Sequence, residues 1–139
     1  MRKHAGGYQG AYLINPRGDS KSIAFDFGHR TEVYQSCSLQ WQNHFYVFGG
    51  YNTKENLRRQ VSMVKSNRME RKATLDFDLR LGACAILNQL TIVLCFDYDE
   101  PNMCRQSNNP LGSFTKLPNS IFDHEWTSVA SFDGENKFY

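Results

Sequence analysis

A short pattern that recurs at a nearly constant spacing restricts this 139-residue chain to few folds. An apolar run around Cys37 is followed by a polar turn and a second apolar run, and the same order returns around Cys84 and Ala130. Cys37 and Cys84 are 47 positions apart, and Cys84 and Ala130 are 46 positions apart. The spacing predicts an array of similar units, in which Cys37 and Cys84 hold the same strand position. Each turn carries an asparagine, as hairpin connections favour: Asn43, Asn88 and Asn136.

Short runs of β-branched and aromatic residues, separated by Gly, Asn, Asp and Pro, predict an all-β chain. No segment has a convincing amphipathic helical pattern. Each full repeat accommodates four strands, and half a repeat precedes and follows the two full ones. Four-stranded units with this period match propeller blades better than a sandwich, which lacks such self-similarity. The predicted strands cover residues 11–14, 21–25, 35–40, 44–48, 60–64, 71–77, 82–87, 90–96, 103–107, 113–117, 127–132 and 137–139.

Two segments resemble the kelch-repeat family of β-propellers. Residues 45–50 look like the family's hydrophobic strand ending in a glycine pair. Residues 104–118 are similar to its strand–turn–strand, with Phe114 where the family usually has Trp. The second repeat departs from the family pattern, because it lacks the glycine pair and the Tyr-Asp that usually follows the third strand. Gly49 and Gly50 are expected to be structural, since they end an inner strand where side chains are excluded.

The resemblance implies four-stranded antiparallel kelch-like blades, about three blades' worth, in a single propeller segment that spans residues 1–139. The segment divides into a half blade (1–27), two complete blades (35–78 and 82–118) and a second half blade (127–139). Closed propellers have about four to eight blades, so this segment is an incomplete propeller. The missing blades would come from a longer chain or from other copies of this chain in a homo-oligomer.

Cys95 and Cys104 are candidates for a disulfide because they flank a loop between two strands that are expected to be neighbours. The preceding repeat lacks cysteine at both corresponding positions. This joint presence and absence favours a loop-closing disulfide and an oxidising compartment. A pair of reduced thiols in a cytosolic protein remains the alternative. The scattered histidines and the absence of a Cys-x-x-Cys pair predict no metal site, and no cofactor is expected.

Charge and hydropathy argue against several classes of protein. Lys and Arg total 16 against 14 Asp and Glu, and the net charge of +2 argues against a nucleic-acid binder. No apolar run approaches the ~18 residues of a membrane span. Met1 to His4 lead into glycines rather than an apolar signal core, so no signal peptide is expected in these residues. Intracellular and extracellular locations both stay open.

Arg17, Gly18 and Asp19 lie between the predicted strands 11–14 and 21–25, where a hairpin tip is expected. The tripeptide looks like the integrin-recognition motif of extracellular matrix proteins, which must be exposed to act. The surrounding Pro-x-Gly-Asp is also ordinary turn chemistry. An adhesion motif and a simple turn therefore both remain as interpretations.

The repeat pattern favours a non-catalytic scaffold that binds a protein partner. A rigid set of blades would present loops that differ in length and charge between repeats. Catalysis is not expected, because no activated nucleophile or oxyanion hole can be identified. The alternatives are a secreted adhesive or matrix component and a fragment of a copper-oxidase-like propeller enzyme. The candidate partner-binding residues are Tyr51, Asn52, Lys54, Arg58, Arg59, Tyr98, Asp99 and Glu100.

Overall fold

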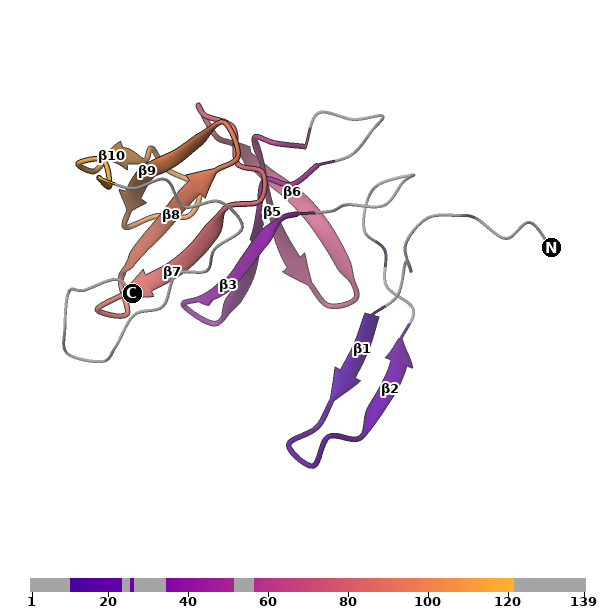
Figure 1. The fold of residues 1–139 in the computed structure, drawn as a ribbon. Helices are drawn as coiled ribbons and strands as arrows, with labels where there is room; N and C mark the ends of the chain where they lie inside the picture. Colours follow the sequence, from indigo (N-terminus) through magenta and orange to yellow (C-terminus); the bar gives the residue numbers. More distant parts are fainter. Residues whose placement is uncertain (1–10, 24–25, 27–34, 52–56, 122–139) are drawn as a thin grey trace.

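The computed structural model describes residues 11–23, 26, 35–51 and 57–121, and these residues contain β-strands and no helix. The strands form one two-stranded and two four-stranded antiparallel sheets (Figure 1). The sheet orders are β1-β2, β3-β4-β5-β6 and β10-β9-β8-β7, so every strand pairs with its neighbour in the chain. The strands are β1 (Ala11–Ile14), β2 (Ser20–Ile23), β3 (Cys37–Trp41), β4 (His44–Phe48), β5 (Gln60–Lys65), β6 (Arg68–Thr74), β7 (Ala83–Leu87), β8 (Thr91–Asp97), β9 (Glu100–Ser107) and β10 (Thr115–Lys116).

The hairpin turns form where the asparagines predicted them. Gln42 and Asn43 have φ angles of 45° and 65°, and Asn88 and Gln89 have φ angles of 49° and 59°. Two successive residues with positive φ give the strands the twist that a hairpin needs, and asparagine tolerates this conformation well. The turn predictions at Asn43 and Asn88 are therefore confirmed. Asn136 and the predicted strands 127–132 and 137–139 lie outside the described residues.

The strand predictions are right in number over the described residues and differ mainly at the ends. The strand predicted at 44–48 has the bounds of β4, whereas the one predicted at 71–77 is in fact β6, Arg68–Thr74. β6 starts earlier because the connection from β5 is a tight two-residue turn, in which Ser66 has a φ of 56°. β9 likewise starts at Glu100, before the predicted residue 103, because only two residues separate it from β8.

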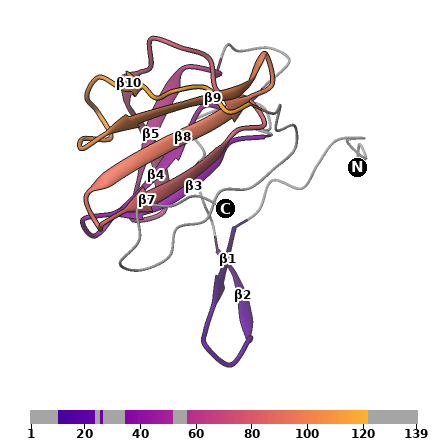
Figure 2. The same ribbon diagram turned by 60° about the vertical axis from the view of Figure 1, so that its left-hand side comes forward.

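The two four-stranded sheets pack face to face around one apolar cluster, and Figure 2 shows β7–β9 lying over β3–β5. Phe48 and Val61 from one sheet and Ile92 from the other are fully buried in it, and Leu94 is 1% exposed. The segment between β6 and β7 adds Leu75, Phe77 and Leu79. Phe114 meets the rings of Phe48 and Phe77 edge-on, with ring centres 6.3 and 5.9 Å apart. Such edge-to-face contacts are favourable beyond the area they bury.

Strand register shows how the two repeats correspond. Two residues connect Trp41 to His44 in the first hairpin, whereas three connect Leu87 to Thr91 in the second. When the two hairpins are aligned on their strand pairings, Cys37, which pairs with Phe48, corresponds to Ala83, which pairs with Cys95. The sequence spacing predicts that Cys37 and Cys84 hold the same strand position, and this prediction is wrong. They are one residue out of step, so their side chains belong to opposite faces of the repeat.

A second buried cluster lies on the face of the β7–β10 sheet that points away from the β3–β6 sheet. Tyr46 and Phe48 of the first repeat correspond to Val93 and Cys95 of the second. Tyr46 and Phe48 face the β7–β10 sheet, whereas Val93 and Cys95 join Leu87 in a separate buried cluster. The β7–β10 sheet thus carries buried residues on both faces.

The β1–β2 hairpin projects away from the two larger sheets (Figures 1 and 2). Next along the chain, Asp26 forms an isolated parallel bridge with β6: its N–H donates to the Asn67 carbonyl, and its carbonyl accepts from the N–H of Met69, both at 2.8 Å. Among the described residues, no helix is long and apolar enough to cross a membrane.

The packing between the sheets predicts unequal effects for two phenylalanines on β4. Phe48→Ala should lower the free energy of unfolding by about 3–5 kcal/mol, because it removes a fully buried ring. Phe45→Ala is the matched control: Phe45 is 43% exposed, and its loss should cost about 1 kcal/mol or less. Urea unfolding measures both values, and equal losses would contradict the described packing.

Candidate functional site

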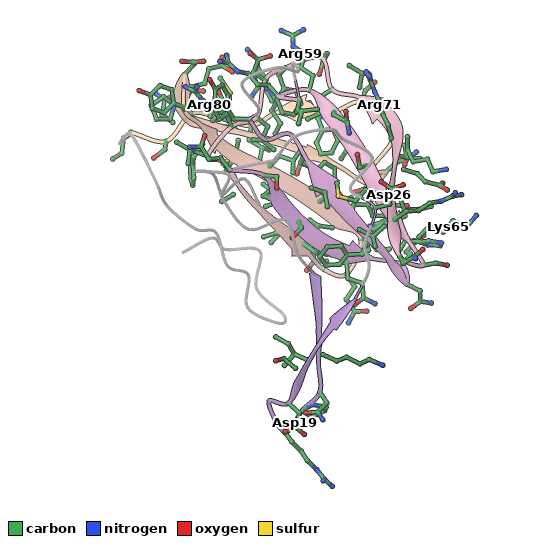
Figure 3. The ribbon with its side chains drawn as sticks, turned by 90° about the vertical axis from the view of Figure 1, so that its right-hand side faces the viewer. Asp19, Asp26, Arg59, Lys65, Arg71 and Arg80 are labelled. Atoms are coloured by element: carbon green, nitrogen blue, oxygen red, sulfur yellow. A yellow bond between two sulfur atoms is a disulfide. The ribbon has the colours of Figure 1, made fainter. Side chains whose placement is uncertain are left out.

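Three connections meet at one end of the paired sheets. They are the loop after β4, the segment between β6 and β7, and the turn between β8 and β9, and residues from all three are in contact. Figure 3 shows Arg59 and Arg80 at this end of the molecule, with Asp19 at the opposite end. We call these contacting residues the arginine–tyrosine cluster: Tyr51, Arg58, Arg59, Asp78, Arg80, Tyr98 and Asp99.

Arg80 lies at the centre of the cluster. The central carbon of its guanidinium is 4.2 Å from the ring centre of Tyr98 and 5.4 Å from that of Tyr51. Both distances fall in the range of cation–π attraction. Its Nε is buried and has no hydrogen-bond partner among the described residues. Arg80 therefore joins the loops of two different sheets through aromatic contacts.

Asp97 fixes the position of the Arg80 backbone. Its carboxylate is 3% exposed and accepts hydrogen bonds from the backbone N–H of Arg80 at 2.5 Å and from that of Asp99 at 3.0 Å. In return, the N–H of Tyr98 donates to the Arg80 carbonyl at 2.9 Å. A bulge between Cys95 and Asp97 turns this carboxylate inward. These hydrogen bonds hold the β8–β9 turn against the segment between β6 and β7.

Asp78 contacts the other two arginines of the cluster, Arg58 and Arg59. Its carboxylate accepts a hydrogen bond from Nε of Arg59 at 2.6 Å and lies 3.6 Å from Nη1 of Arg58. Arg58 also lies 3.8 Å from the carboxylate of Asp99. The hydrogen bond and the charge of Asp78 raise the pKa of Arg59 above its ordinary value. Because these side chains are partly exposed, the ion pairs contribute little to stability, and their charged groups can reach a binding partner.

Gly49 and Gly50 allow the loop after β4 to approach the inter-sheet segment. Their φ angles are 60° and 114°, and the N–H of Gly50 donates to the Leu79 carbonyl at 2.8 Å. A Cβ on Gly49 would lie 2.0 Å from that carbonyl oxygen. The glycine pair thus lets the chain pass close to Leu79 and places Tyr51 beside Arg80.

The structure brings together most, but not all, of the predicted partner-binding residues. Tyr51, Arg58, Arg59, Tyr98 and Asp99 belong to the cluster. Glu100 instead forms an ion pair with Arg105 at 2.6 Å, and Arg105 stacks over the ring of Phe77. Asn52 and Lys54 lie outside the described residues. Sequence reasoning missed Asp78, Arg80 and Asp97, although the Asp97-Tyr98-Asp99 run is a recognisable turn signal.

Arg17, Gly18 and Asp19 occupy the exposed tip of the β1–β2 hairpin. The side-chain oxygen of Asn15 accepts hydrogen bonds from the N–H of Arg17 at 2.9 Å and from that of Asp19 at 3.0 Å. The Asn15 amide also donates to the Asp19 carboxylate at 2.9 Å. Gly18 has a φ of 87°, which an L side chain rarely adopts. The tripeptide is therefore held in one defined turn.

Cys95 and Cys104 are opposite each other on β8 and β9, and their sulfur atoms lie at disulfide distance, 1.99 Å. Cys37 and Cys84 are free thiols. Within the described ranges, no group of three or more His, Cys, Asp or Glu side chains is placed to hold a metal ion.

Comparisons with known proteins give no assignment: the sequence matches no protein-family model, and no curated protein is significantly similar to it.

The buried carboxylate of Asp97 generates a prediction about the cluster. Asp97→Asn should lower the free energy of unfolding by about 1–3 kcal/mol, because a charged acceptor of two partly buried hydrogen bonds is lost. The control is Asp99→Asn, whose carboxylate is exposed and lies 3.8 Å from Arg58, so about 1 kcal/mol or less is expected. Thermal unfolding followed by circular dichroism compares the two, and an equally large loss for Asp99→Asn would refute this role of Asp97.

Proposed function

We propose that this chain is a non-catalytic scaffold that binds a protein partner, and that its two four-stranded sheets are consecutive blades of a kelch-like propeller. Several features support this arrangement. Each sheet is a meander of four antiparallel strands in chain order, and the second follows the first through one connecting segment. The β7–β10 sheet carries buried residues on both faces, as a blade between two neighbours would.

The arginine–tyrosine cluster is the observation that carries the proposed binding function. It combines side chains from two sheets on a backbone that Asp97 and the glycine pair hold in place. Arginine and tyrosine are enriched among the residues that contribute most to protein–protein binding. Arg59 is half-exposed, and Tyr98 is 46% exposed. These groups offer a partner both charge and flat apolar surface without a large change in the scaffold.

The partner in this proposal is a protein with complementary charge. Because the cluster contains carboxylates and guanidinium groups side by side, its recognition would depend on matched pairs rather than on net charge. Two sheets do not close a propeller, so further blades would come from a longer chain or from other copies of this one.

Paired arginine substitutions test the proposed surface. In Arg58→Ala/Arg59→Ala, quantitative affinity purification from cell extracts should recover bound proteins with a yield lower by about tenfold or more. The control, Lys65→Ala/Arg71→Ala, removes the same charge from exposed residues of the β5–β6 hairpin and should retain binding. Circular dichroism checks that both variants are folded. Equal recovery by the two variants would show that the cluster is not the binding surface.

Adhesion through Arg17, Gly18 and Asp19 is a second candidate function, and the geometry of the hairpin tip favours it. The tripeptide is exposed, held by Asn15 and remote from the arginine–tyrosine cluster (Figure 3). The disulfide geometry of Cys95 and Cys104 fits the oxidising location that an adhesive protein needs.

Cell attachment to protein-coated surfaces tests this second function. Attachment should occur on the unmodified chain and be lost with Asp19→Glu, because the added methylene displaces the carboxylate from its place beside Asn15. Lys21→Ala keeps the tripeptide on the same hairpin and should leave attachment unchanged. Attachment that survives Asp19→Glu would mean that Arg17, Gly18 and Asp19 form only a turn.

A further inference from the structure

The two free cysteines meet at the seam between the four-stranded sheets. β3 and β7 are neighbouring strands of different sheets, and both Cys37 and Cys84 pack against the cluster between them. Their one-residue offset in register places both side chains on the faces that meet between the sheets, where Cys84 helps to raise the pKa of the Cys37 thiol. If the two cysteines held the same position in their repeats, their side chains would lie on corresponding faces of the two sheets and would not both face the seam.

Other contacts hold the seam on either side of the cysteine pair. At one end, the indole N–H of Trp41 donates to the Leu90 carbonyl at 3.1 Å. At the other end, the N–H of Leu81 donates to the Gln35 carbonyl at 3.0 Å. Because strands β3 and β7 are tied beyond both cysteines, the sulfur atoms stay close to each other in the folded chain. A disulfide requires the two sulfur atoms to lie about 2.05 Å apart.

We propose that Cys37 and Cys84 form a redox modification site, at which a small-molecule disulfide oxidises the pair to a second disulfide that joins the two sheets. The thiolate of one cysteine attacks glutathione disulfide and releases one glutathione, leaving a mixed disulfide. The other cysteine loses its proton and attacks the protein sulfur of that mixed disulfide, releasing the second glutathione. The protein loses two hydrogen atoms, and glutathione disulfide is reduced to two molecules of glutathione.

The surroundings set the conditions under which this exchange runs. Burial, together with the hydrogen bond and charge of Cys84, raises the pKa of the Cys37 thiol well above its ordinary value. The Cys37 thiol therefore stays protonated near neutrality, and oxidation should be faster in mildly alkaline buffer. Both residues are partly exposed as a whole, whereas the Cys37 thiol itself is buried, so the exchange should proceed slowly in the folded chain.

The new bond would have a larger effect on the chain than the link between Cys95 and Cys104. The latter closes a sequence separation of 9, whereas Cys37 and Cys84 are 47 positions apart and enclose β4, β5 and β6. Longer closed loops remove more conformational freedom from the unfolded chain. Oxidation should therefore raise the midpoint of thermal unfolding by on the order of 10 °C.

The experiment treats the folded, full chain with glutathione buffers in mildly alkaline solution and then blocks remaining thiols by alkylation. Mass spectrometry should show that both free thiols disappear together, with peptide 31–54 linked to peptide 81–105 after trypsin digestion. Peptide 81–105 also contains Cys95 and Cys104, so chymotrypsin, which cuts after Leu87 and Leu90, is needed to assign the link to Cys84. Cys84→Ser should instead give a single glutathione adduct at Cys37 and no rise in the midpoint.

A comparison within the unmodified chain keeps the test independent of that variant's folding. The same oxidation is run to equilibrium in native buffer and in urea, and the linked peptide should make up a larger fraction of the product in native buffer. The proposal is overturned if the link appears only in urea, or if the folded chain carries separate glutathione adducts on Cys37 and Cys84. The outcome does not depend on the proposed scaffold function, because no partner takes part.

Discussion

The apolar contact between the two four-stranded sheets is the constraint on which the other features depend. Phe48, Val61, Ile92 and Leu94 bury almost all of their surface there, and the aromatic rings of Phe77 and Phe114 pack edge-on within the same cluster. Each sheet alone would expose its side of this contact to water. Joined, they bring β3 beside β7 and carry the loop after β4 to the turn between β8 and β9. Both the arginine–tyrosine cluster and the cysteine contact arise from this packing.

The segment between β6 and β7 connects the core to the candidate site. Leu75, Phe77 and Leu79 insert into the apolar cluster, while the alternate residues Asp78 and Arg80 take part in the surface cluster. Burial alternates from residue to residue along Leu75–Arg80, so one segment can serve both purposes. The approach of Gly49 to the Leu79 carbonyl then fixes how closely the neighbouring loop packs against this segment.

Much of the local structure could be predicted from the sequence, because local chemistry determines it. The run from His44 to Phe48 has the aromatic and β-branched residues of a strand, and the asparagines mark turns that require positive φ. The joint presence of Cys95 and Cys104 in one repeat indicated their pairing. None of these inferences required knowledge of how the sheets pack.

Contacts between repeats were harder to predict. The one-residue difference between the two hairpin loops is invisible in a spacing of 47, yet it reverses the face on which Cys84 lies relative to Cys37. Arg80 was missed because its aromatic neighbours come from loops of two different sheets. The start of β6 at Arg68 was also missed, since charged residues such as Arg68 and Glu70 carry little strand signal.

The register of the two hairpins also has a consequence for assembly. The β3–β6 sheet contacts the β7–β10 sheet with the face that carries Tyr46 and Phe48. The corresponding face of the β7–β10 sheet, which carries Val93 and Cys95, points away from this contact. The contact therefore joins two different surfaces of the repeat. A contact of this kind is heterologous, and a two-fold axis cannot reproduce it. If further sheets associate in the same way, each addition repeats one rotation in one direction. The size of that rotation then determines whether the array closes into a ring or continues as an open helix.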